Sequence, residues 1–86
     1  MRLLVVDDEV NLADALQRGL TAEGFSVDVA HDGEQGLWDA TEQAYDLVVL
    51  DLMLPKLNGY RVIQRLRDRG VWTPILMLTA KDGDYD

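Results

Sequence analysis

The sequence predicts an α/β fold in which helices cover a parallel β-sheet. Short apolar runs alternate along the chain with longer stretches of helical spacing, in the order strand-helix-strand-helix-strand-helix-strand. This alternation is typical of parallel strands that are joined by right-handed helical crossovers. The runs that we assign to strands are Leu3–Val6, Phe25–Ala30, Leu47–Leu50 and Ile75–Leu78.

The residue pattern inside each run indicates where its strand lies in the sheet. Three runs are apolar throughout, as expected of strands that are covered on both faces. The run Phe25–Ala30 alternates apolar and polar residues, so we place it at an edge. If the run Leu47–Leu50 then lies beside Leu3–Val6, the strand order begins 2-1-3. The connections leave strands 1 and 3 in opposite directions, and such a switch point binds ligands at the carboxyl ends of the strands.

The stretches between the strands show helical spacing and residues typical of helix ends. The first helix is predicted from an apolar stripe that stops before Gly24: Leu12, Ala13, Leu16 and Leu20. Asp32 is the predicted N-cap of the second helix, with Gln35 as its partner, and the buried face follows: Leu37, Ala40 and Ala44. Asn58 is predicted to cap the third helix, which stops at Gly70 and buries Val62, Ile63 and Leu66.

Composition narrows the classes of protein that fit. The 86 residues are enough for one small domain, and 48% of them are hydrophobic, which favours a globular chain. The chain has no cysteine and no apolar run long enough to span a membrane, and we expect a cytoplasmic location. The net charge of −8 disfavours direct nucleic-acid binding and suits a cation site or a basic partner surface.

Carboxylates follow two strands that we place side by side. Asp7 and Asp8 come directly after the first strand, and Asp51 follows the third. Crowded like charges repel, and a hard divalent cation such as Mg²⁺ relieves the repulsion through oxygen ligands. Mg²⁺ bound this way leaves room for a phosphate oxygen, which indicates phosphoryl chemistry. Thr79 ends the fourth apolar run, where its hydroxyl could donate to a phosphoryl oxygen. The alternative is that these acids and Thr79 are helix caps and surface polar groups.

Three stretches together resemble the receiver domain of bacterial two-component response regulators, most closely the OmpR/PhoB type: LLVVDDE, DLVVLDLMLPKLNGY and PILMLTA. The resemblance covers the whole chain in order. It implies a flavodoxin-like, doubly wound parallel sheet with strand order 2-1-3-4 and, in the family, a fifth strand. Helix 4, strand 5 and helix 5 of the family are missing here, so we interpret residues 1–86 as one partial receiver domain.

The resemblance also implies a role for individual residues. Asp51 matches the phosphoacceptor, which takes a phosphoryl group from a kinase phosphohistidine. Asp8 matches the direct Mg²⁺ ligand, and Asp7 matches its neighbour, which acts mainly through water. Met53 matches the position whose main-chain carbonyl ligates the metal. Thr79 matches the switch hydroxyl, and Ala80 matches the small residue beside it that leaves room for phosphate access.

The chain departs from the family pattern after its fourth strand. The family lysine at the end of strand 5 has no counterpart, because Lys81 lies only two residues after Thr79 and is interpreted as a loop charge. The family's aromatic switch residue and dimerisation surface are missing as well, and no DNA-binding domain follows. We therefore expect the 86 residues to be part of something longer. On their own, we expect them to dimerise by pairing of the fourth strand or by swapping elements, or to bind a partner that supplies the missing strand.

Other chemistry-bearing side chains are given structural interpretations. His31 is interpreted as a turn residue, because no second ligand or base lies near it in the sequence. Trp38 and Trp72 are interpreted as packing or partly exposed aromatics rather than as a nucleic-acid stacking platform, on the expectation that no basic groove surrounds them. Three arginines at four-residue spacing are interpreted as a solvated helix face: Arg61, Arg65 and Arg69.

Three functions remain open on the sequence alone. The first is a phosphoacceptor module that a sensor histidine kinase phosphorylates and that controls a transcriptional output domain, without being a turnover enzyme. The second is an interaction module that keeps the fold but is not competent for phosphorylation. The third is a small Mg²⁺-dependent phosphohydrolase, which lacks an evident acid, base or substrate pocket. A labelled acyl-phosphate donor separates the first two functions, and release of phosphate from diverse esters would favour the third.

Overall fold

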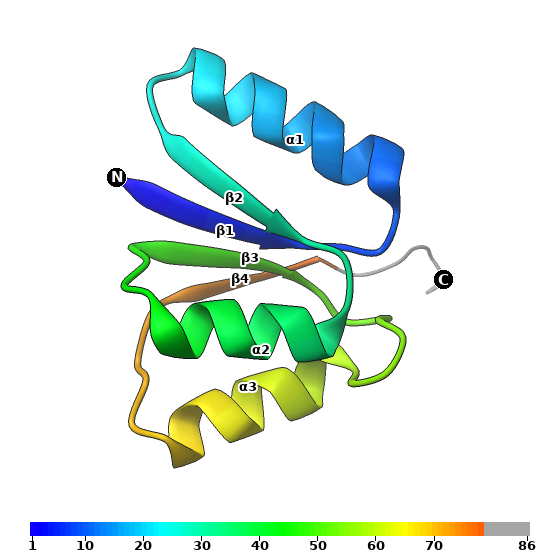
Figure 1. Ribbon diagram of the computed structural model, residues 1–86, viewed down its shortest axis with the longest axis vertical. Coiled ribbons are helices and arrows are strands. Elements are labelled where there is room, and N and C mark those ends of the chain that lie inside the picture. Colours follow the sequence, from blue (N-terminus) through cyan, green and yellow to red (C-terminus); the bar gives the residue numbers. More distant parts are fainter. Residues whose placement is uncertain (79–86) are drawn as a thin grey trace, which may run out of the picture.

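A computed structural model describes residues 1–78 of the chain. Within this range, four parallel strands form one sheet with the order β2-β1-β3-β4, which confirms the predicted α/β fold. Helix α1 lies on one face of the sheet, and α2 and α3 lie side by side on the other (Figure 1). The elements are β1 Arg2–Val6, α1 Val10–Ala22, β2 Ser26–Ala30, α2 Gly33–Glu42, β3 Leu47–Asp51, α3 Gly59–Asp68 and β4 Ile75–Leu78.

The central strands are buried on both faces, as their apolar runs predict. Side chains of β1 alternate between two cores, with Leu4 and Val6 facing α2 and α3, and Leu3 and Val5 facing α1. Strand β2 pairs only with β1 among the described strands, which confirms its edge position. Strand β3 is one residue longer than predicted and ends with Asp51 itself. The backbone of Asp51 is therefore held by strand pairing.

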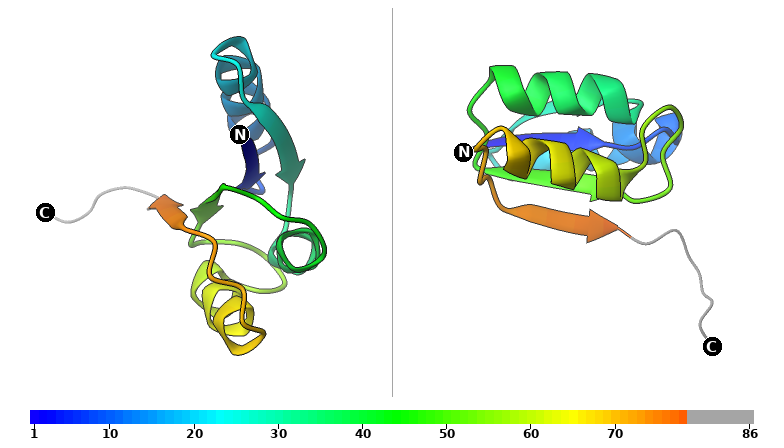
Figure 2. Two further views of the ribbon diagram at one scale, coloured as in Figure 1. Left: turned by 90° about the vertical axis from the view of Figure 1, so that its left-hand side faces the viewer. Right: turned by 90° about the horizontal axis from the view of Figure 1, so that it is seen from below.

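The face of the sheet under α1 is covered unevenly. Helix α1 packs on β1 and β2, and β4 lies to one side of it (Figure 2). Leu12 is 45% exposed and Leu76 is 54% exposed, so the predicted stripe of α1 is only partly buried. Apolar side chains line a hollow of about 370 Å³ here: Leu3, Leu12, Leu16, Leu20, Leu47, Val49, Leu76 and Leu78. Nothing in the described part of the chain fills it.

Helices α2 and α3 begin at the predicted N-cap residues, and the predicted glycines follow the ends of α1 and α3. The Asp32 carboxylate accepts from the Gln35 backbone N–H at 2.8 Å, and the Asn58 side chain accepts from the Arg61 N–H at 3.0 Å. Gly24 and Gly70 have positive φ angles of 100° and 77°, as helix-terminating glycines do. Helix α2 ends at Glu42, so Ala44 lies beyond it and is exposed, contrary to the prediction.

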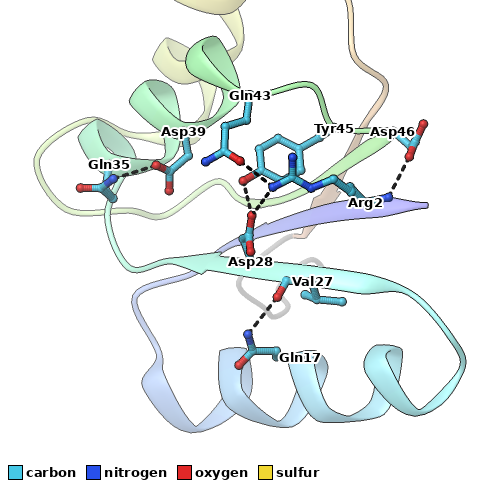
Figure 3. A network of polar contacts seen from close by, with 9 residues as sticks. All are labelled: Arg2, Gln17, Val27, Asp28, Gln35, Asp39, Gln43, Tyr45 and Asp46. Carbon is cyan, nitrogen blue, oxygen red and sulfur yellow. Dashed lines mark hydrogen bonds and ion pairs between the residues drawn. The ribbon is translucent and has the colours of Figure 1, made fainter.

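A polar network joins the amino-terminal parts of the strands (Figure 3), whereas Asp51 lies at the carboxyl end of β3. The Arg2 guanidinium donates to the Asp28 carboxylate of β2 at 2.9 Å, and the Tyr45 hydroxyl donates to the same oxygen at 2.6 Å. Burial raises the pKa of the Tyr45 hydroxyl, and its bond to Asp28 raises it further. The Arg2 backbone N–H donates to Asp46 at 2.8 Å. These contacts tie the start of β3 to β1 and β2.

Two glycines in different environments give opposite stability predictions. A Cβ at Gly36 in α2 would lie 2.7 Å from a Val6 methyl, whereas a Cβ at Gly19 in α1 would meet nothing within 4 Å. We expect Gly36→Ala to lower the free energy of unfolding by about 1–3 kcal/mol through overpacking. Gly19→Ala should instead raise it by about 0.5–1 kcal/mol through helix propensity. Urea unfolding of both variants checks this, and equal effects at the two sites would contradict the packing of α2 on β1.

Candidate functional site

Three carboxylates meet at the carboxyl edge of β1 and β3. Val6 of β1 is in register with Leu50 of β3, so Asp7 follows β1 at the level where Asp51 ends β3. Asp8 joins them from the loop after β1. One carboxylate oxygen from each of Asp7, Asp8 and Asp51 lies within 4.8 Å of the others. The predicted convergence of the two strand ends on one acidic site is thus present in the structure.

Asp7 is the buried member of the cluster. Its side chain is only 2% exposed, its N–H donates to the Ala30 carbonyl at 3.0 Å, and its carboxylate accepts from the Glu9 N–H at 2.9 Å. Burial raises the pKa of Asp7, and the negative charges of Asp51, Asp8 and Glu9 add to the increase. The hydrogen bond from Glu9 acts in the opposite direction. A nearby cation would offset the cost of the ionised Asp7 carboxylate.

Asp51 is held by the turn that follows it. Its carboxylate accepts from the Met53 N–H at 3.0 Å. Gly59, the first residue of α3, donates its N–H to the Leu52 carbonyl at 3.1 Å, and a Cβ at Gly59 would lie 2.7 Å from the Asp51 carbonyl oxygen. Only glycine fits this close approach of α3 to the end of β3. The Asn58-Gly59 pair thus fixes the backbone that carries Asp51.

Asp8 and Met53 border an open space next to the cluster. They line one hollow of about 430 Å³ together with residues of the loop before α3 and its first turn: Leu52, Leu54, Pro55, Asn58 and Tyr60. Asp8 is exposed, and the Met53 side chain is 68% exposed. The hollow leaves room for a second reactant beside the exposed Asp8 carboxylate. Thr79 and Ala80 lie outside the described residues, and the last described residue, Leu78, is in register with Asp51.

Two residues next to the site make contacts that were not predicted from the sequence: His31 and Glu9. Nδ1 of His31 lies 3.1 Å from the Asp7 carbonyl oxygen, which can only accept, so this contact requires a proton on Nδ1. Its position was available from the strand pattern, because His31 follows β2 at the same sheet edge. Glu9 is the N-cap of α1 and accepts from the Leu12 N–H at 3.1 Å. Glutamate is not a usual N-cap residue, so this role of Glu9 was not predicted.

The expectation that no basic groove surrounds Trp38 is wrong. Trp38 lines one hollow with Lys56, Arg65 and Arg69, because α2 and α3 pack side by side. Trp72 has a different environment, because the guanidinium carbon of Arg67 lies over its ring, 5.3 Å from the ring centre. The arrangement of Trp38 depends on tertiary packing that helical spacing alone does not give.

The donor set of the site suits a hard divalent cation. All three side chains offer carboxylate oxygens, and Mg²⁺ prefers oxygen ligands and usually takes one or two carboxylates in proteins. The cluster brings negative charges together without a basic side chain of residues 1–78 in an ion pair with any of them. Asp7, Asp8 and Asp51 therefore fit the Mg²⁺ site that was predicted from the sequence.

Neutralising Asp7 should stabilise the cation-free protein. The pKa of Asp7 is higher in the folded chain than its ordinary value of 3.8, so the folded state binds this proton more tightly. Stability is then lost as the pH rises from that value through the folded-state pKa. We expect Asp7→Asn, which keeps the oxygen that accepts from Glu9, to raise the urea midpoint at neutral pH without divalent cations. The exposed Asp68→Asn is the matched control, and a lower midpoint for Asp7→Asn alone would contradict the charge repulsion.

Comparison with known proteins identifies the family. The sequence profile of the response regulator receiver domain matches residues 3–86. The chain belongs to this family. Its relatives are response regulators of the OmpR/PhoB type, as the resemblance predicted. Receiver domains of response regulators are regulatory modules and not classical enzymes.

Curated relatives match this receiver domain over nearly its whole length. The transcriptional regulatory protein DltR of Streptococcus agalactiae is 52% identical over 86 residues, which are 100% of this chain and 38% of DltR. The alkaline phosphatase synthesis transcriptional regulatory protein PhoP of Bacillus subtilis is 48% identical over 85 residues, which are 99% of this chain and 35% of PhoP. The receiver domain thus spans little more than a third of the length of these relatives.

Solved structures share the receiver fold. The response regulator TrrA of Thermotoga maritima, in complex with Mg²⁺ and BeF, has a TM-score of 0.86 at 38% identity over 94% of this chain and 70% of TrrA. The receiver domain of the sensor histidine kinase PA1611 of Pseudomonas aeruginosa has a magnesium ion in its active-site cleft. Its TM-score is 0.87 at 32% identity, over 93% of this chain and 67% of that domain.

Proposed function

We propose that this receiver domain accepts a phosphoryl group on Asp51 from a sensor histidine kinase and thereby controls a transcriptional output domain. The clustering of Asp7, Asp8 and Asp51 carries the proposal, because it provides a nucleophilic carboxylate beside a cation site. The relatives that are named as transcriptional regulators support the proposed output. No helix within residues 1–78 is long and apolar enough to cross a membrane. We place this function in the cytoplasm, where a kinase domain can reach the chain.

The proposed reaction is an in-line transfer between two nucleophiles. A carboxylate oxygen of Asp51 forms a bond to phosphorus while the bond from phosphorus to the histidine nitrogen of the kinase breaks. The imidazole leaves with the electron pair of that bond and takes up a proton. Asp8, Asp51 and the Met53 carbonyl are the proposed direct Mg²⁺ ligands, and Asp7 is proposed to act mainly through water. The bound ion would neutralise charge on the transferring group.

The residues of this chain act by holding the acceptor in place. Asp51 ends a paired strand, its carboxylate is oriented by the Met53 N–H, and Gly59 packs against its carbonyl. Such positioning contributes to the rate because little reorganisation is needed at the moment of transfer. Thr79 is the proposed switch hydroxyl that follows the phosphoryl group, and Ala80 is the proposed small residue for phosphate access. The resulting acyl phosphate returns to the carboxylate by hydrolysis.

Labelled acetyl phosphate with Mg²⁺ separates this function from its alternatives. Label retained on the protein and lost in hydroxylamine supports the phosphoacceptor, because hydroxylamine cleaves acyl phosphates. A folded chain without label supports the interaction module. Multiple-turnover release of phosphate from unrelated phosphate esters supports the phosphohydrolase. The measurement is made on this chain and on a version extended to the length of the solved receiver domains, which supplies the strand-5 lysine of the family.

We also propose that the 86-residue chain self-associates when it is studied alone. Strand β4 pairs only with β3 among the described strands, and Leu76 and Met77 are 54% and 50% exposed. An apolar edge strand has unpaired backbone groups that can pair with another chain. Sedimentation at micromolar concentration should show a dimer or larger species, and Leu76→Lys should shift the chain toward monomer. Tyr60→Lys, at an exposed aromatic residue elsewhere, is the control. A monomer with protected amides along β4 would contradict this proposal.

A further inference from the structure

A hollow between α2 and α3 combines basic and aromatic side chains on a face that the phosphoacceptor chemistry does not use. Its volume is about 290 Å³. Figure 1 shows the two helices side by side on the same face of the sheet, and residues of both line the hollow. The lining residues are Glu34, Leu37, Trp38, Lys56, Leu57, Arg65 and Arg69. The α2–α3 hollow therefore has apolar, aromatic and basic parts.

Most basic side chains of this acidic protein lie in one segment, and three of them line the hollow: Lys56, Arg65 and Arg69. The chain has 8 lysines and arginines against 16 acidic residues. Residues 56–69 contain most of these basic side chains: Lys56, Arg61, Arg65, Arg67 and Arg69. A local positive region on a chain of net charge −8 is not explained by overall composition. It indicates attraction of a negatively charged partner to this face in particular.

The basic side chains at the hollow are weakly engaged within the protein. Across residues 1–78, Arg65 forms no ion pair, and Lys56 Nζ lies 3.8 Å from the Asp32 carboxylate. The Arg69 guanidinium donates to the Thr41 hydroxyl at a long 3.3 Å and forms no ion pair within the same residues. Arg67, in contrast, is used for folding, because it donates to the Val71 and Thr73 carbonyls at 2.9 and 3.0 Å. Three cations at the hollow are thus available to an external anion.

Trp38 gives the hollow an apolar anchor point. Its side chain is 61% exposed on the surface of α2, although tryptophan is among the residues with the most to gain from burial. Leu37 and Leu57 lie in the same hollow and are buried and half-buried, respectively. Tryptophan and arginine are the residue types most enriched among the energetically dominant residues of protein interfaces. The combination is typical of a surface that a partner protein covers.

We propose that the α2–α3 hollow docks an acidic, amphipathic segment of a partner protein. Carboxylates of the segment would pair with Arg65, Arg69 and Lys56, and an apolar side chain would cover Trp38. A groove between two packed helices suits a helical segment laid along it. The proposal does not rest on phosphorylation of Asp51. A nucleic acid fits less well, because Glu34 lies at the hollow and the rest of the chain would repel a long polyanion.

Fluorescence of Trp38 tests the proposal directly. Trp72→Phe leaves Trp38 as the single tryptophan in the 86-residue chain. The probe is a short synthetic helical peptide with glutamates on one face and leucines beside them, titrated at low and high salt. We expect saturable binding that changes the Trp38 emission and weakens as salt increases. Arg65→Ala combined with Arg69→Ala should weaken binding by about tenfold or more.

Matched controls make each outcome decisive. Arg18→Ala removes an exposed arginine from α1, whose partner Asp14 is 3.8 Å away, and should leave the affinity unchanged. Folding of every variant is checked by circular dichroism. The proposal is overturned if the peptide does not bind, if a peptide with glutamine in place of glutamate binds equally well, or if the double variant binds like the parent. Tighter binding of a single-stranded oligonucleotide than of the acidic peptide also overturns it.

Discussion

Asp51→Asn is expected to reduce phosphate incorporation from acetyl phosphate or a phosphorylated kinase to background, a loss of about a hundredfold or more. The amide replaces the anionic nucleophile by a neutral group, while its oxygen can still accept from the Met53 N–H, which lies 3.0 Å from the carboxylate in the native chain. The loss should therefore come from chemistry and not from unfolding. The assay uses the chain extended to the length of the solved receiver domains, and hydroxylamine-sensitive label is counted.

The matched control for this prediction is Asp68→Asn, which removes the same charge from an exposed position on α3. It should be labelled like the parent chain. Unfolding curves should show that both variants remain folded. Undiminished labelling of Asp51→Asn would mean that another carboxylate is the acceptor, and the assignment of Asp51 would then be wrong.

Asp8→Ala is expected to weaken Mg²⁺ or Mn²⁺ binding by about tenfold or more, and more than Asp7→Ala does. Asp8 is the exposed acid that borders the open hollow, whereas Asp7 is buried and its carboxylate is engaged by the Glu9 N–H. Direct ligation by Asp8 and an indirect role for Asp7 through water would produce this difference. Nuclear magnetic resonance shifts of the amides around residues 7–9 and 51–53 report the binding.

Asp68→Asn again serves as the control, because it changes the net charge without touching the cluster. It should bind the cation as the parent chain does. Equal titration curves for the parent chain and Asp8→Ala would count decisively against the proposed metal site. A larger loss of cation affinity for Asp7→Ala than for Asp8→Ala would mean that Asp7, and not Asp8, is the direct ligand.

The strands and the acidic site were predictable because their signals are local. Each strand begins and ends within one residue of the apolar run that predicted it. The alternation in residues 25–30 correctly placed that strand at an edge. Carboxyl ends of parallel strands meet at one edge of a sheet, so Asp7 and Asp51 had to converge once the order was known. The positions of Asp32 and Asn58 as N-caps follow from the same local chemistry.

The loop before α3 was not predictable because its shape depends on a contact with α2. Lys56 has a positive φ of 68°, and the Leu57 N–H donates to the Pro55 carbonyl at 2.7 Å, which is the pattern of a tight γ-turn. Gly33 at the start of α2 has no room for a Cβ, because the Leu57 carbonyl oxygen occupies that place. Neither Lys56 nor Gly33 carries a sequence signal for this pairing. The basic surroundings of Trp38 were missed for the same reason.

Mapping the phosphorylated residue tests the central claim most directly. The extended chain is incubated with acetyl phosphate and Mg²⁺ and then reduced with borohydride, which converts an aspartyl phosphate to homoserine. Peptide mass spectrometry then reads the position of the modified residue. Phosphorylation of Asp51 predicts homoserine at position 51 and unmodified Asp7 and Asp8. Homoserine at position 7 or 8, or an unmodified Asp51 in a chain that carries label, would contradict the account.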